Sequence, residues 1–117
     1  YELFKDTDVT FITDDVFNNY RVDLFDKADL FINTSCEHMK PMKEWGPAPE
    51  YKNPWWDRVS PAYFAFQSNA MFDIPTHTNC VNNIEEFKKQ LPDRAEVLIE
   101  DEIPDERGTR FTLIGKI

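Results

Sequence analysis

The chain has 117 residues, of which 41% are hydrophobic, and this size predicts one globular domain with a core of its own. Its net charge of −9 argues against direct contact with nucleic-acid phosphates. No apolar stretch approaches the ~20 residues of a membrane span, and two cysteines do not form a disulfide framework, so we expect a cytoplasmic protein.

The first third of the chain contains two predicted strands. Residues 8–13 (DVTFIT) are rich in β-branched and aromatic side chains, which indicates a strand. Residues 16–24 have apolar side chains at four-residue spacing and fit a short helix, although two asparagines weaken that prediction. Residues 28–33 (ADLFIN) contain an unbroken apolar run, which is typical of a strand buried on both faces in a parallel sheet.

Residues 39–61 lack any periodic pattern and hold five of the eight prolines and all three tryptophans. Proline removes amide donors and fixes φ, so regular structure is not expected there. A flexible linker would not carry so much aromatic surface, and we therefore predict an ordered, functional loop. Trp45 either stacks on a planar substrate or covers an edge of the core.

The second half of the chain predicts a helix and three strands. Residues 62–67 (AYFAFQ) form an apolar run, and residues 83–90 follow an asparagine cap as a helix. Residues 95–99 and 110–114 indicate strands, and the acidic loop 100–109 between them predicts an antiparallel hairpin. The order of elements predicts a single α/β domain over residues 1–117, with a mostly parallel sheet that ends in this hairpin.

The segments ADLFINTSCEHM (28–39), QSN (67–69) and TRFTLIGKI (109–117) resemble methyltransferase-like proteins. The element order is similar to the carboxyl-terminal part of a class I S-adenosylmethionine-dependent methyltransferase, which implies a partial Rossmann-like sheet. The resemblance implies that Asp15 contacts the adenine of the cofactor and that Asn33 lies where cofactor and substrate meet. It also implies a methyl acceptor, which is either a small molecule or a substrate that the sequence does not identify.

The family's glycine-rich cofactor loop has no counterpart in this sequence. The three glycines, Gly46, Gly108 and Gly115, do not lie between a strand and a helix. We therefore expect S-adenosylmethionine to bind this chain weakly or not at all. The chain alone is not expected to be competent for methyl transfer.

Polar residues after the two apolar strands are the candidate site, because ligands bind beyond the carboxyl ends of strands in open α/β sheets. Glu37 and His38 are the candidate catalytic residues, since imidazole and carboxylate groups move protons at neutral pH. On an extended segment, His38 would share a face with Cys36, and Glu37 would point away. Candidate substrate-binding residues are Trp45, Gln67 and Asn69.

Two alternatives remain open beside this interpretation, which assigns no metal ligand. In the first, Cys36, His38, His77 and Cys80 converge as a small zinc or thiol enzyme, because tetrahedral zinc accepts thiolates and imidazoles. In the second, the chain is a non-enzymatic acidic module. In both the second alternative and the preferred interpretation, the ADLFIN edge joins copies into a homo-oligomer, with neither nucleic acid nor a membrane as partner.

Overall fold

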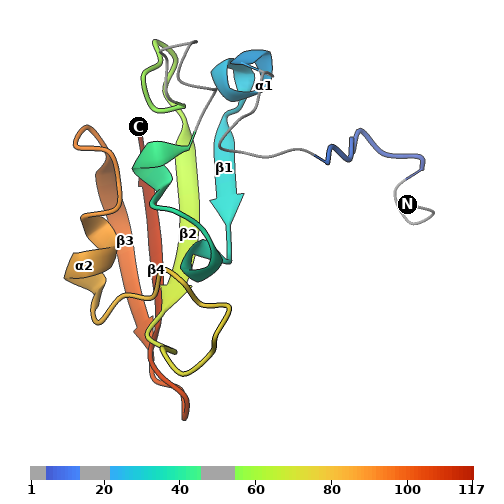
Figure 1. Cartoon of the computed structure of the whole chain (residues 1–117). Helices are drawn as coiled ribbons and strands as arrows, with labels where there is room; N and C mark the ends of the chain where they lie inside the picture. Colours follow the sequence, from blue (N-terminus) through green and yellow to red (C-terminus); the bar gives the residue numbers. More distant parts are fainter. Residues whose placement is uncertain (1–4, 14–21, 46–54) are drawn as a thin grey trace.

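The computed structural model describes residues 5–13, 22–45 and 55–117 (Figure 1). Its elements are α1 (Val22–Lys27), β1 (Leu30–Asn33), the 3₁₀ turns η2 (Cys36–His38) and η3 (Met42–Glu44), β2 (Tyr63–Asn69), α2 (Ile84–Lys88), β3 (Glu96–Ile103) and β4 (Arg110–Lys116). These elements form a small α/β domain. No helix within the described ranges has the length and apolar character needed to cross a membrane.

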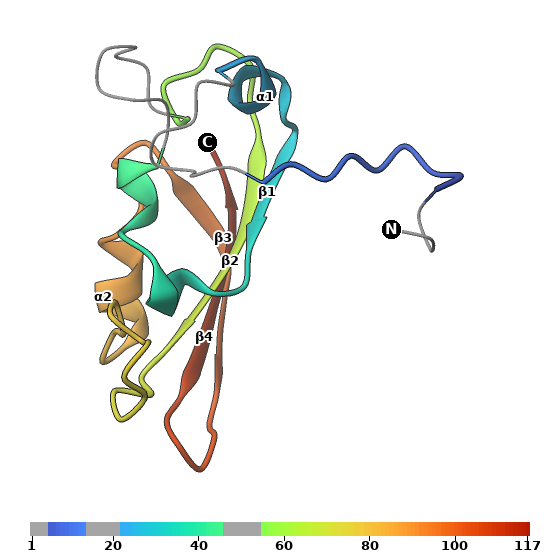
Figure 2. The same cartoon turned by 45° about the vertical axis from the view of Figure 1, so that its right-hand side comes forward.

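The sheet has the strand order β1-β2-β4-β3. β1 and β2 run parallel, whereas β4 is antiparallel to both β2 and β3. The prediction of a mostly parallel sheet is therefore wrong for the described strands. The reason is that β4 lies between β2 and β3, so both of its pairings are antiparallel. Residues 8–13 belong to no strand and run away from the sheet, so they add no parallel pair (Figures 1 and 2). Side-chain composition favours an extended backbone but does not supply the strand with which it pairs.

The predicted helix 83–90 and the predicted strands 28–33, 62–67, 95–99 and 110–114 are confirmed with shifted boundaries. β2 continues to Asn69 and β3 to Ile103, so the connection to β4 is shorter than the predicted loop 100–109. The helix cap is one residue later than the first asparagine, because the Asn83 side chain accepts a hydrogen bond from the Glu86 backbone N–H at 2.9 Å. The predicted helix at 16–24 lies outside the described residues except for its last positions, where α1 begins.

The core lies on the face of the sheet that carries α2, η2 and η3 (Figure 2). Alternate residues of β2 and β4, among them Phe64, Phe66 and Leu113, point into it. Both ends of the proline- and tryptophan-rich segment pack here. The Trp55 indole N–H donates to the Met42 carbonyl at 2.7 Å, which ties the segment to η3. The described parts of this segment are thus ordered, as expected, and residues 46–54 lie outside the description.

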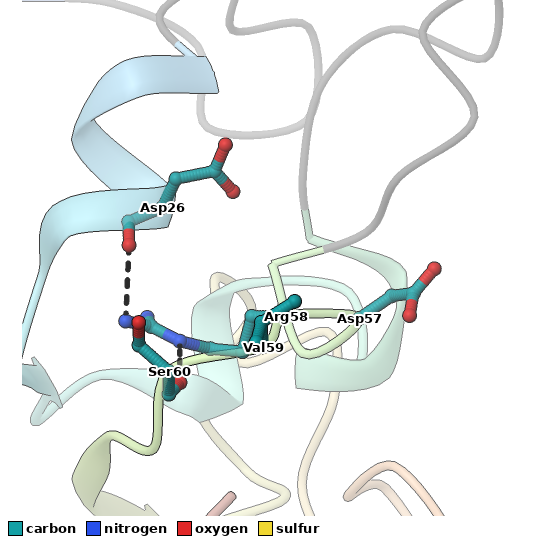
Figure 3. A pocket seen from close by; sticks show the side chains of 5 residues that line it. All are labelled: Asp26, Asp57, Arg58, Val59 and Ser60. Carbon is teal, nitrogen blue, oxygen red and sulfur yellow. Dashed lines mark hydrogen bonds between the residues drawn. The ribbon is translucent and has the colours of Figure 1, made fainter.

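A buried arginine joins the segment before β2 to the end of α1 (Figure 3). The Arg58 guanidinium donates to the carbonyls of Phe25 at 2.9 Å, Asp26 at 3.1 Å and Ser60. It therefore satisfies carbonyls that the helix end leaves without intrahelical partners. A cavity of about 310 Å³ lies beside it and is lined by Asp26, Asp57, Arg58, Val59 and Ser60. Because Arg58 is committed to backbone carbonyls, its role is structural.

Candidate functional site

The carboxyl ends of β1 and β2 lie at the same edge of the sheet, because the two strands are parallel. Asn33 ends β1 and shapes the turn into η2. Its side-chain oxygen accepts a hydrogen bond from the Ser35 backbone N–H at 3.0 Å, and its amide nitrogen donates to the Met39 sulfur at 3.1 Å. Both ends of the Asn33 side chain are therefore engaged in forming the turn.

The 3₁₀ turn η2 separates residues that an extended chain would have placed together. Cys36 is fully buried, and Glu37 is only 7% exposed, whereas His38 is exposed. A 3₁₀ helix has three residues per turn, so neighbouring side chains point about 120° apart rather than to opposite sides. The expectation that Cys36 and His38 share a face is therefore wrong.

Cys36 is a core residue in this arrangement. Its thiol donates to the Asn33 carbonyl at 3.7 Å. Burial, with a smaller contribution from the negative charge of Glu37, raises the pKa of the Cys36 thiol to about 12. The thiolate needed for nucleophilic attack is thus strongly disfavoured at neutral pH.

Asn69, at the end of β2, organises the segment that follows. Its side-chain oxygen accepts hydrogen bonds from the Met71 backbone N–H at 3.0 Å, from the Cys80 thiol at 3.5 Å and from His77 Nδ1 at 3.1 Å. A backbone N–H can only donate, so the contact with Met71 fixes which atom of the amide is the oxygen. A neutral His77 ring therefore carries its proton on Nδ1 and has its lone pair on Nε2.

The same tautomer follows for His38 from a different partner. His38 Nδ1 lies 2.9 Å from the Thr76 carbonyl oxygen, which can only accept a hydrogen bond, so Nδ1 carries a proton. His38 Nε2 faces Glu37 Oε1 at 3.6 Å. In the neutral ring, the lone pair of Nε2 therefore faces the Glu37 carboxylate.

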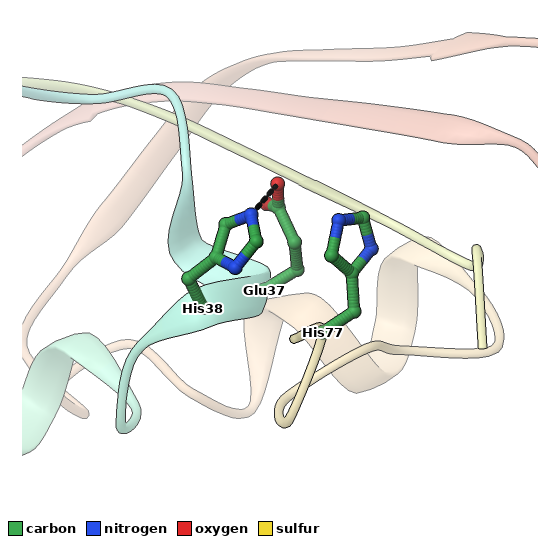
Figure 4. A group of neighbouring side chains, drawn as sticks. All are labelled: Glu37, His38 and His77. Carbon is green, nitrogen blue, oxygen red and sulfur yellow. Dashed lines mark ion pairs between the residues drawn. The ribbon is translucent and has the colours of Figure 1, made fainter. Parts of the chain in front are cut away.

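Glu37, His38 and His77 form a compact group at this edge (Figure 4). One ligand atom from each residue lies within 4.8 Å of those from the other two. The imidazole rings are 4.5 Å apart between centroids and are nearly perpendicular. These are the two histidines of the chain, so every imidazole of the protein belongs to this cluster.

The connection between the two strand ends is reinforced by the backbone. The Asn79 N–H donates to the Glu37 carbonyl at 2.8 Å, which holds η2 against the segment after β2. Cys80 lies nearby, and burial and then the charge of Glu37 raise the pKa of its thiol. The zinc alternative from the sequence brought the two histidines together with Cys36 and Cys80, whereas the structure groups them with Glu37.

The remaining candidate residues are dispersed. Trp45 is 5% exposed and packs against Trp55 and Phe66. Of its two predicted roles, this packing fits the one in which Trp45 covers an edge of the core. Gln67 is exposed and donates to the Thr112 hydroxyl of β4 at 3.2 Å. Asp15 lies outside the described residues.

Comparisons with protein-family models, curated proteins and solved structures find no match for this chain. The methyltransferase-like interpretation therefore stays a prediction. The function has to be argued from the geometry of the site.

Proposed function

We propose that Glu37, His38 and His77 bind a divalent transition-metal ion, zinc fitting best, and that this centre is the functional site of the protein. One observation carries the proposal: both histidines use Nδ1–H as a donor to a protein oxygen, which leaves both Nε2 lone pairs for a ligand. Histidines that bind metals almost always donate their second N–H to a carbonyl or carboxylate in this way.

The burial of Glu37 supports the same conclusion. Taking a carboxylate out of water is unfavourable unless a cation or several donors compensate its charge. A metal ion between Glu37 and the two imidazoles supplies that compensation, and the net charge of −9 favours cations in general. Tetrahedral zinc needs ligand atoms roughly 3.3 Å apart, given bonds of about 2.0–2.1 Å. Atoms that already lie within 4.8 Å reach this spacing through small side-chain rotations.

Two histidines and one glutamate are a ligand set of catalytic zinc sites, which keep a fourth position open for water. Zinc lowers the pKa of such a water to about 7 and so supplies hydroxide at neutral pH. The chemistry that this geometry supports is metal-assisted hydrolysis. The sequence offered a site with two thiols and two imidazoles as an alternative. In the proposed site Glu37 replaces the thiols as a ligand, because Cys36 lies in the core.

Calorimetric titration of chelator-treated protein with zinc tests the proposal. We expect one ion per chain with micromolar affinity or better. Glu37→Gln and His77→Ala should each weaken it by at least about tenfold, as loss of even an outer-shell partner does. Glu85→Gln, a change of an exposed glutamate in α2, is the matched control and should leave the affinity unchanged. Equal affinities in all four proteins would overturn the proposal.

A second candidate function is the methyltransferase-like one. It is supported by the directions of the strands, since a parallel pair followed by a hairpin with an antiparallel last strand is what the resemblance implies for the end of the family's sheet. The described residues do not fit the cofactor, however. Asn33 is engaged in its turn, Gly108 lies in the hairpin connection, and Gly115 lies inside β4.

We therefore expect the chain to carry at most the acceptor side of such a site, with Glu37 and His38 as its acid–base residues. Titration with S-adenosylmethionine should give no measurable binding at micromolar concentration. Micromolar affinity for the cofactor would contradict this expectation and would favour a methyltransferase over a metal-dependent hydrolase.

A further inference from the structure

The two edges of the sheet differ in how they are protected against pairing with another strand. The register of β3 against β4 shifts between Val97 and Ile99, as at a bulge, and four of the eight residues of β3 are acidic. Charges and bulges are the usual means by which proteins block an edge. β1 at the opposite edge, with the sequence LFIN, has neither charge nor proline. Within the described part of the chain, no strand pairs with its outer side.

An apolar row crosses the face of the sheet opposite the core. In the strand register, Ile32 lies beside Ala65, Ala65 beside Ile114, and Ile114 beside Ile99. The helices α2, η2 and η3 all lie on the other side (Figure 2). Ile32, at the β1 end of the row, is 66% exposed. A strand added beside β1 would therefore extend both the hydrogen-bonded ladder and this apolar row.

Residues 8–13 have the character of such a strand. Their sequence, DVTFIT, is β-branched and aromatic, and Val9 and Ile12 are about half exposed. The segment runs away from the β1 edge of its own chain in both views (Figures 1 and 2). A strand-forming segment directed away from its own sheet is placed to reach the sheet of a neighbour.

We propose that two copies of this chain associate by exchanging residues 8–13, each segment adding a strand beside β1 of the other copy. A two-fold axis makes the two contacts identical and closes the assembly at a dimer. The segment is added to β1, the edge strand without charges. This pairing explains why β1, unlike β3, lacks charges that would block an added strand. The inference uses none of the metal-binding residues and stands independently of the proposed function.

Like charges oppose this association, since each copy has a net charge of −9. Salt screens repulsion between surface charges, so added salt should strengthen the dimer. Light scattering after size exclusion at micromolar concentration should give twice the 13.8 kDa mass of the chain. A monomer in both low and high salt would overturn the proposal.

Two variants distinguish pairing at the β1 edge from stacking of two copies through the sheet face opposite the core. Ile32→Lys places a charge on the β1 edge and should give a monomer. Ile99→Lys is the matched control, because Ile99 lies in the same apolar row, is 54% exposed and belongs to the other edge strand. It should leave the dimer intact. If both variants dissociate equally, the copies stack through their faces and the exchange is refuted.

A mixing experiment tests the exchange itself. Thr10→Pro removes a backbone donor from the exchanged segment and should also give a monomer. Residue 10 lies outside the four-stranded sheet of its own chain, so the circular dichroism should lose only the signal of the exchanged strand. The Ile32→Lys copy retains an intact segment, and the Thr10→Pro copy retains an intact edge. Their mixture should form heterodimers through one exchanged strand. A mixture that stays monomeric would overturn the proposal, and if Ile32→Lys proves unfolded, Thr10→Pro alone decides between dimer and monomer.

Discussion

Two neighbouring tryptophans give a matched test of whether the described ends of the proline- and tryptophan-rich segment belong to the core. Trp55 and Trp56 each donate an indole N–H to a carbonyl of η3, at 2.7 Å to Met42 and at 3.0 Å to Lys43. Trp55 is 2% exposed, whereas Trp56 is half-buried at the surface. Replacing each by phenylalanine removes the same donor from two different environments.

We expect Trp55→Phe to lower the free energy of unfolding by about 2 kcal/mol. The lost hydrogen bond accounts for about 1 kcal/mol, and the smaller ring for about 1 kcal/mol of lost burial and packing. The Met42 carbonyl keeps a second donor, the Trp45 backbone N–H at 3.1 Å, so it is not left unpaired. Water replaces the lost donor at the surface, so Trp56→Phe should cost less than about 1 kcal/mol.

Urea unfolding followed by circular dichroism measures both losses. With a slope of about 1–3 kcal/mol per molar urea, Trp55→Phe should shift the midpoint by roughly 1 M. Equal shifts for the two variants, or a loss below about 1 kcal/mol for Trp55→Phe, would refute the assignment of Trp55 to the core.

Two further predictions concern the hairpin and the buried thiol. Gly108→Ala should destabilise the protein by about 1–3 kcal/mol, because Gly108 has φ of +149° and a Cβ would come 2.7 Å from the Ala70 carbonyl oxygen; an unchanged melting temperature would contradict this. Since burial raises the pKa of Cys36 from 9.0 to about 12, its contribution to stability is complete below pH 9 and falls above it, by about 1.4 kcal/mol per pH unit. The difference in unfolding free energy between the native protein and Cys36→Ala should therefore shift above pH 9, and a difference that stays constant to pH 10.5 would count against this prediction.

The sequence predicted correctly those helices and strands that are specified by patterns of neighbouring residues. The apolar runs LFIN and YFAF, the asparagine cap of α2 and the strand patterns at 95–99 and 110–114 all depend on neighbouring residues, and the structure confirms them. Residues 8–13 have an equally strong local signal but lie outside the sheet. Strand pairing is a long-range property, and side-chain composition does not determine the partner.

The candidate site, too, could be predicted only in part from local patterns. Parallel strands bring their carboxyl ends together, and the zinc alternative used this to place His38 near His77, where the structure has it. Whether Cys36 or Glu37 lies beside the two imidazoles depends on the backbone conformation of residues 36–38. The 3₁₀ turn buries Cys36 in the core and places Glu37 beside the imidazoles. No local signal in the sequence distinguished this turn from an extended segment.

The absorption spectrum of the protein titrated with cobalt(II), a substitute for zinc, tests the central claim most directly. A centre formed by Glu37, His38 and His77 predicts visible bands of a four- or five-coordinate ion at one equivalent, without the near-ultraviolet charge-transfer band of a cobalt–thiolate bond. The bands should persist in Cys80→Ser and disappear in His38→Ala. A thiolate band, or a spectrum no different from that of cobalt in buffer, would contradict the account.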